Sequence, residues 1–105
     1  MNNELEHPLC EYVWSFAVRE NRIRSEKPGV QIKIRRRIDF MLKFAQENQY
    51  NVPVNDIYLL GLGTLVVRST MHLLVDAKIA KPIGSGRHMY YEFVDPNIFL
   101  STNAK

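Results

Sequence analysis

Apolar residues recur along this chain at intervals of three and four, in separate stretches that give way to a short alternating segment. Such spacing places the apolar side chains on one face of a helix. The first stretch predicts a helix over about residues 8–22, with Pro8 in its first turn. Its apolar face consists of Leu9, Val13, Phe16 and Ala17. Tyr12, Trp14 and Ile23 lie beside or beyond this face.

The second stretch can be read in two ways. Val30, Ile32 and Ile34 alternate with polar residues like a short strand. A longer helical pattern overlaps them and favours a helix over about residues 30–48, after a linker at residues 24–29 that contains Pro28 and Gly29. The predicted buried face is Val30, Ile34, Ile38, Met41, Leu42 and Ala45, widened by Phe40 and Phe44.

Two further helices are predicted on either side of a glycine turn. The first begins near Pro53, with Asn55 or Asp56 as its cap, buries Ile57 and Leu60, and ends at Gly61. The second takes Thr64 as its N-cap and ends near Lys78. Its predicted buried face is Val67, Met71, Leu74 and Val75.

The C-terminal part predicts a β-hairpin. Apolar residues flank Pro82, which marks an edge strand, and Gly84-Ser85-Gly86 supplies a tight reversal. In the returning strand, Met89, Tyr91 and Phe93 alternate with Tyr90, Glu92 and Val94. Residues 97–100 are a last apolar element before a polar tail. This element either caps the core or packs on a second copy of the chain together with the first helix.

The passage from about residue 34 to 94 resembles a winged helix-turn-helix domain. The spacing Ile57-x3-Gly61-x5-Val67, followed by a strand and a wing-like GSGRHMYYEFV, carries the resemblance. Ile57 stands where many members have Ala, and Lys78 stands where many have Gly. The resemblance implies an α+β fold, a helical core with a C-terminal β-hairpin wing and here an extra N-terminal helix. It divides the chain into residues 1–29, 30–94 and 95–105.

The distribution of charge points to an acidic partner. A chain of 105 residues suits one domain, and its formal net charge is +3. Eight of the 14 Lys and Arg fall within residues 19–37. Arg35, Arg36 and Arg37 sweep roughly 200 degrees of a helix, so at least one must face solvent or phosphate. A solvated charged face is the alternative interpretation.

The inventory of reactive residues does not favour an enzyme. The three histidines are scattered, no paired cysteines or histidines have metal-ligand spacing, and no glycine-rich loop follows a strand. Cys10, set among apolar residues, is expected to be a small buried hydrophobe. We expect no cofactor, metal or small-molecule substrate. With no signal peptide and no apolar run long enough to span a membrane, we expect a cytoplasmic protein.

Because of the resemblance, we predict that residues 64–78 form a recognition helix in the major groove of duplex DNA, with the wing, residues 79–94, on the backbone or in the minor groove. Arg68 is the expected base reader, with Thr64 and Ser69 on phosphates. The full predicted DNA-binding set is Arg35, Arg36, Arg37, Thr64, Leu65, Val66, Arg68, Ser69, His72, Lys81, Ser85, Arg87 and His88.

Three alternatives remain open from the sequence. Leu65, Val66 and Leu73 could form an apolar patch that binds protein instead of DNA. The DNA-binding role could also be in replication or partition instead of transcription. A homodimer is predicted through Leu9, Val13, Trp14 and Phe16, although Trp14 could equally close the edge of the core.

Overall fold

The computed structural model describes residues 5–103, apart from the side chains of residues 87 and 100–103. Within that range it is an α+β fold of five α-helices and one three-stranded antiparallel sheet. The elements are α1 (Cys10–Arg19), α2 (Pro28–Glu47), β1 (Asn51–Pro53), α3 (Val54–Tyr58), α4 (Thr64–Asp76), β2 (Ala80–Ile83), a 3₁₀ turn (Gly86–His88), β3 (Tyr90–Phe93) and α5 (Pro96–Asn103).

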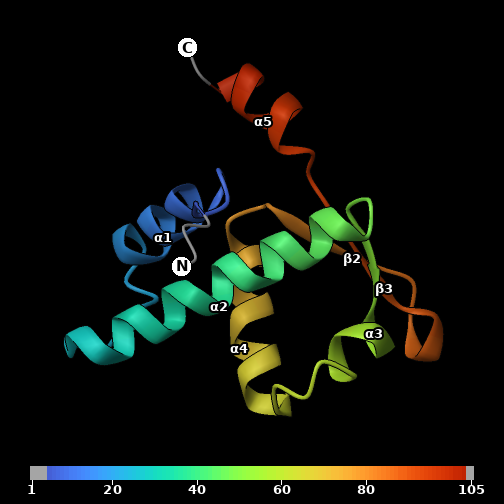
Figure 1. Ribbon diagram of the computed structural model, residues 1–105, viewed down its shortest axis with the longest axis horizontal. Helices are drawn as coiled ribbons and strands as arrows, with labels where there is room; N and C mark the ends of the chain where they lie inside the picture. The colour runs from blue at the N-terminus through green and yellow to red at the C-terminus, as the bar shows by residue number, and fades with distance from the viewer. Residues whose placement is uncertain (1–4, 104–105) are drawn as a thin grey trace.

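The long helix α2 runs across the molecule from one side to the other (Figure 1). α1 and α4 pack against it, while the sheet and α3 lie toward its C-terminal end and α5 projects from the end of β3. The space between these elements is filled by one apolar cluster. Its largest fully buried members are Leu9, Ile38, Met41, Leu42, Ile57, Leu74, Ile79, Val13, Val52 and Cys10.

The helical interpretation of residues 30–48 is confirmed, and the strand interpretation is wrong. α2 begins two residues earlier than predicted, at Pro28, where a missing backbone N–H costs a helix nothing. Ile38, Met41, Leu42 and Ala45 of the predicted face are buried, and Ile34 and Phe44 are partly buried. The prediction is wrong for Val30 and Phe40, which are 38% and 44% exposed. The first two turns of α2 therefore extend beyond the core.

The helix α1 is shorter than predicted at both ends, and its apolar face lies inside the protein. Leu9, Val13 and Ala17 are fully buried, while Trp14 and Phe16 are only partly buried. The prediction that Leu9 and Val13 contact a second copy is wrong, because both side chains already pack within their own chain.

The hairpin is confirmed, but the sheet has a third strand that the sequence did not predict. The strand order is β1-β3-β2, so Pro82 does lie on an edge strand. β1 pairs with β3, placing Val52 opposite Tyr91. The connection between β2 and β3 is longer than the tight glycine reversal that we predicted, because it includes the 3₁₀ turn Gly86–His88.

Two predicted helix caps are wrong. Pro53, and neither Asn55 nor Asp56, occupies the N-cap position of α3. Gly63 occupies the N-cap position of α4, with φ of 73°, and its carbonyl oxygen accepts the Val67 N–H at 3.1 Å. Thr64 is therefore the first residue of the helix.

The C-terminal helix α5 continues through residues 101–103, which we expected to be part of a polar tail.

Lys78 closes α4 in a left-handed conformation, with φ of 65°. Its N–H donates to the Val75 carbonyl at 3.0 Å, and the Ile79 N–H donates to the Leu74 carbonyl at 2.9 Å. This is the Schellman arrangement of helix ends, in which the left-handed position favours glycine.

We predict that Lys78→Gly raises the free energy of unfolding by about 0.5–1 kcal/mol, because glycine adopts positive φ without the Cβ penalty. Urea unfolding monitored by circular dichroism measures the change. Ala77→Gly is the matched control, because φ at Ala77 is −78° and glycine there should destabilise the helix end. A lower unfolding free energy for Lys78→Gly would contradict the prediction.

Among residues 5–103, no helix combines the length and the apolar character needed to cross a lipid bilayer.

Candidate nucleic-acid interface

The helix α4 presents one polar face to solvent, as predicted. Val67, Met71 and Leu74 turn inward and are buried together with Thr70. The opposite face exposes Thr64, Leu65, Arg68, Ser69 and His72, whereas Val66 is only partly exposed. The α4 side chains that we predicted to face DNA are thus exposed, except that Val66 is partly buried.

Beside this face lies a hollow between α4, the first half of α2 and the loop after α1, with a volume of about 440 Å³. We call it the basic hollow. Arg22, Arg37 and Arg68 line it, together with a single carboxylate, Asp76. Arg22 pairs with that carboxylate at 3.5 Å from Nε to Oδ2. The three arginines and one aspartate give the hollow a net charge of +2. Because Arg22 is paired with Asp76, Arg37 and Arg68 carry this charge.

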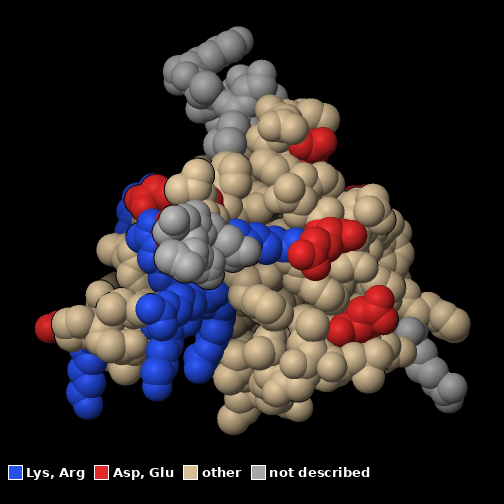
Figure 2. Space-filling model, in the orientation of Figure 1, with Lys and Arg blue, Asp and Glu red and all other residues tan. Residues whose placement is uncertain are grey.

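The wider surface shows the same bias. In Figure 2, Lys and Arg side chains gather at lower left, over the N-terminal half of α2 in the orientation of Figure 1. The acidic residues on the right half of this face are separated from that group. A polyanion would therefore be attracted to the side of the molecule where α2 passes α4.

Arg35, by contrast, is occupied within the chain. Its Nε donates to Glu6 at 2.6 Å, its Nη2 donates to Glu6 at 2.8 Å and to Glu11 at 2.6 Å, and it lies 5.8 Å from the centre of the Trp14 ring. These hydrogen bonds hold the pKa of Glu6 below its usual value, because the paired carboxylate resists protonation. The Arg35 guanidinium is thus paired with two carboxylates of its own chain, and the predicted phosphate contact would have to displace them.

The described residues that we predicted to bind DNA from the wing do not lie on the same surface as the exposed face of α4. Lys81 pairs in register with Glu92, on the sheet face opposite to the one where Pro82 and Tyr91 face α4. Lys81 therefore lies apart from the predicted recognition residues of α4. Ser85 and His88 are exposed in the β2–β3 connection, and the side chain of Arg87 lies outside the described residues. Arg36 is exposed on α2, one step around the helix from Arg37.

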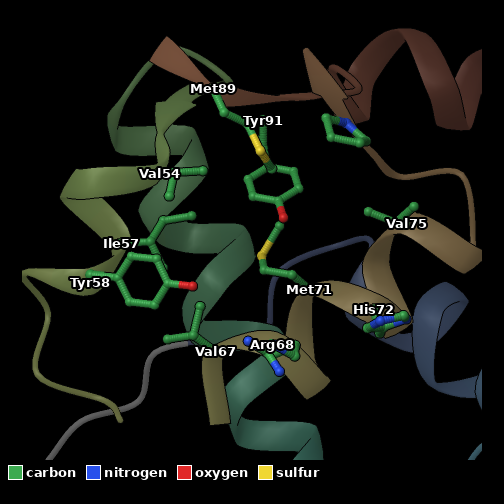
Figure 3. Close-up of a pocket in the computed structure, with 11 residues that line it drawn as sticks. Val54, Ile57, Tyr58, Val67, Arg68, Met71, His72, Val75, Met89 and Tyr91 are labelled. Carbon is green, nitrogen blue, oxygen red and sulfur yellow. The ribbon is translucent and has the colours of Figure 1, made fainter. Parts of the chain in front are cut away.

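A second hollow, on the other flank of α4, was not predicted. It lies between α3, α4 and the sheet, with a volume of about 390 Å³ (Figure 3). We call it the apolar pocket. Val54, Ile57, Met71, Met89 and Tyr91 are among its walls, and Arg68 and His72 line it from α4. Arg68 therefore borders both hollows.

The sequence contained one signal for this pocket. Met89, just before β3, and Tyr91, in β3, are two residues apart and both line the pocket, and Tyr91 is only partly buried there. Burial raises the pKa of the Tyr91 hydroxyl, so this phenol is neutral and can donate a hydrogen bond across the physiological range.

Within residues 5–103, no group of three or more His, Cys, Asp or Glu side chains is arranged so that it could hold a metal ion. Cys10 is fully buried, as predicted, and its burial raises the pKa of the thiol to about 12. At neutral pH it is a thiol and a poor nucleophile.

Comparisons with known proteins add no relative. No protein-family model, curated protein or solved structure matches this chain.

Proposed function

We propose that this protein binds duplex DNA through α4 and acts in the control of transcription. One observation carries the proposal: Arg37 from α2 and Arg68 from α4 open into the same hollow, beside the exposed polar face of α4. The order of α3, α4, β2 and β3 supports it, because helix, turn, helix and hairpin follow one another as the winged helix-turn-helix resemblance implies.

Each residue of the face has a role in this proposal. The Arg68 guanidinium reads a guanine edge in the major groove, because its planar fork matches the N7 and O6 acceptors. Ser69 and Thr64 hold phosphates near the start of α4, and Arg37 neutralises a phosphate on the flanking strand. The apolar Leu65 contacts a thymine methyl group.

The salt dependence of binding tests this proposal. We expect the affinity for a duplex to fall roughly 40- to 500-fold between about 50 and 200 mM salt, as three to five phosphates neutralised by Arg37 and the other Lys and Arg side chains of this basic side release counterions. Fluorescence anisotropy with labelled duplexes, first a random pool and then the selected sequences, measures the affinity. A change of less than about threefold over that range would contradict DNA binding.

A second function is favoured by the turn between α3 and α4. Leu59 and Leu65 are 83% and 77% exposed, and Tyr58, which precedes Leu59, is also exposed. Several exposed apolar side chains within one short segment, here residues 58–65, are typical of a protein-binding surface. A protein partner held there would bind with little salt dependence, in contrast to DNA.

We also propose a homodimer that uses the outer surface of α1 and α5. Tyr12 and Phe99 meet there edge to face, with ring centres 4.9 Å apart, and Ile98 beside them is 67% exposed. Trp14 and Phe16 remain available on α1, since both are only partly buried.

If this surface joins two copies, Ile98→Glu should convert a dimer into a monomer, because a carboxylate buried at the interface has no partner charge. Light scattering during size-exclusion chromatography measures the mass. Leu59→Glu, in the α3–α4 turn, is the control and should stay dimeric. A monomeric wild-type protein at high concentration would contradict the proposal.

A further inference from the structure

The apolar pocket beside α4 has the size and lining of a small-molecule site. Its volume of about 390 Å³ falls within the roughly 300–1,000 Å³ that such sites occupy. α3 contributes Val54 and Ile57, α4 contributes Met71, and the end of the hairpin contributes Met89 and Tyr91. Methionine side chains adapt their shape to the ligand that they contact, which suits a pocket of this kind.

Polar groups converge on this apolar space from three elements. Figure 3 shows the phenol rings of Tyr58 and Tyr91 directed toward the gap between α3 and α4, with the Arg68 guanidinium below them. His72 lies one helical turn further along α4. Within residues 5–103, the structure records no hydrogen bond or ion pair for the Arg68 guanidinium. An apolar pocket with an unpaired cation and two phenol donors at its edge suits a ligand with an apolar body and an anionic end.

We propose that the apolar pocket binds a small monocarboxylic acid with an aromatic or alkyl body. The carboxylate pairs with the Arg68 guanidinium and accepts a hydrogen bond from Tyr58 or Tyr91. The apolar body lies against Met71 and the α3 side chains. A neutral apolar group, such as a side chain from a partner protein, would leave the cation at the edge of the pocket unused.

The position of Arg68 couples this ligand to the other side of α4. Because Arg68 borders both hollows, a carboxylate that holds its guanidinium in the apolar pocket withdraws it from the basic hollow. The ligand and DNA would then compete for one side chain. This coupling rests on the proposed DNA binding, whereas binding of the acid by itself does not.

The full-length protein can be tested with two matched probes, 4-phenylbutyrate and its uncharged analogue 4-phenylbutanamide. NMR titration of the labelled protein follows the backbone amides. We expect the acid to bind with a Kd on the order of 1 mM, shifting the amides of Tyr58, Arg68, Met71 and Tyr91. The amide probe should bind at least about tenfold more weakly, because it lacks the charge that pairs with Arg68.

Two variants separate recognition of the acid from general attraction of an anion. Arg68→Gln should weaken binding of 4-phenylbutyrate about tenfold and leave binding of the amide probe unchanged. Lys81→Gln removes the same charge from the opposite face of the sheet and should change neither Kd. The inference is overturned if the two probes bind equally, if Arg68→Gln binds the acid as tightly as wild type, or if the perturbed amides lie elsewhere. It is also overturned if roughly ten times the expected Kd of acid shifts no amide.

A second measurement distinguishes this inference from the proposed function. Saturating 4-phenylbutyrate should lower the affinity of wild-type protein for duplex DNA at constant ionic strength, and the amide probe should not. A protein that binds the acid at Arg68 but binds no DNA would support the pocket and overturn the proposed function. A protein that binds DNA but not the acid would do the reverse.

Discussion

Replacing both Arg37 and Arg68 with glutamine is expected to lower the affinity for duplex DNA by roughly 30- to 1,000-fold. The estimate corresponds to about 2–4 kcal/mol, since a good arginine–guanine contact contributes about 1–3 kcal/mol and the lost phosphate contact adds to it. The double variant leaves Arg22 as the one arginine lining the basic hollow, and Arg22 is paired with Asp76. Anisotropy titration at fixed salt measures the affinity.

The two single variants are expected to differ in kind. Arg68→Gln should remove most of the discrimination between a selected duplex and random DNA, because it deletes the expected base contact. Arg37→Gln should weaken binding to every duplex alike and reduce the salt slope by about 0.9, the contribution of one phosphate. If Arg37→Gln instead changed the sequence preference, the assignment of these two roles would be wrong.

A matched control is available in Lys81→Gln. It removes one positive charge, as the other variants do, but from the outer face of the sheet, where Glu92 lies opposite. If net charge alone drove binding, this variant would lose as much affinity as Arg37→Gln. We expect less than a threefold change. All variants should unfold at the same temperature as wild type, since Lys81 and Arg68 are exposed and Arg37 is only partly buried.

The parts of the fold that the sequence predicted are those that depend on local periodicity. α2 and α4 each repeat apolar residues at helical spacing over at least three turns, so the central part of the α2 buried face, most of the α4 buried face and the exposed face of α4 follow from the sequence alone. The boundaries were less accurate, because the caps depend on backbone conformation. For example, Thr64 was predicted to be the N-cap of α4 because threonine is common at that position, but Gly63 occupies it.

The parts that the sequence did not predict depend on pairings between distant residues. β1 has three residues and one buried side chain, Val52, which is too short a pattern to stand out, and it becomes a strand only by pairing with β3. Arg35 belongs to a run of three arginines that the sequence predicted to bind DNA, of which at least one had to face solvent or phosphate. Glu6 and Glu11 lie 29 and 24 positions away from it in sequence, and only the docking of α1 on α2 brings them to its guanidinium.

That contact changes how the basic N-terminal region should be understood. Arg35 links the start of α1 to α2 through its hydrogen bonds with Glu6 and Glu11. The positive charge available to a partner is carried by the neighbouring arginines, Arg36 and Arg37. The apolar pocket likewise forms through contacts between distant residues. Its walls come from α3, α4 and the hairpin, so the sequence of any one of these segments does not predict it. Where a function depends on surfaces between elements, sequence periodicity can identify the faces but cannot pair them.

The second large effect is expected at His7, which lies just before α1 and is 4% exposed. Its Nδ1 accepts the Leu9 N–H at 3.1 Å, while its own backbone N–H donates to the Asp39 carboxylate at 2.6 Å. A protonated ring would carry hydrogen on Nδ1 and could no longer accept from Leu9. Burial lowers the pKa of His7 below 6.5, which outweighs the opposite effect of the Asp39 charge.

The sign of the pH dependence follows from that shift. Because the pKa is lower in the folded state, the unfolded chain binds the extra proton first as the pH falls below about 6.5. The stability contributed by the neutral ring is therefore complete above that pH and is lost as the pH falls through the folded-state pKa. We expect the free energy of unfolding to decrease between pH 7 and pH 5 by as much as about 2 kcal/mol, the limit for one extra proton bound by the unfolded chain at about 1.36 kcal/mol per pH unit below 6.5. Urea unfolding at each pH measures it.

His7→Asn tests the cause, because an asparagine side-chain oxygen can accept the Leu9 N–H and does not titrate in this range. Its unfolding free energy should be nearly the same at pH 7 and pH 5. His88→Asn, at an exposed position in the β2–β3 connection, should keep the wild-type pH dependence. The carboxylates paired with Arg35 do not confuse the comparison, since the pKa values of Glu6 and Glu11 are held below 4.5, outside the window. A wild-type protein equally stable at both pH values would show that the start of α1 does not depend on a neutral His7.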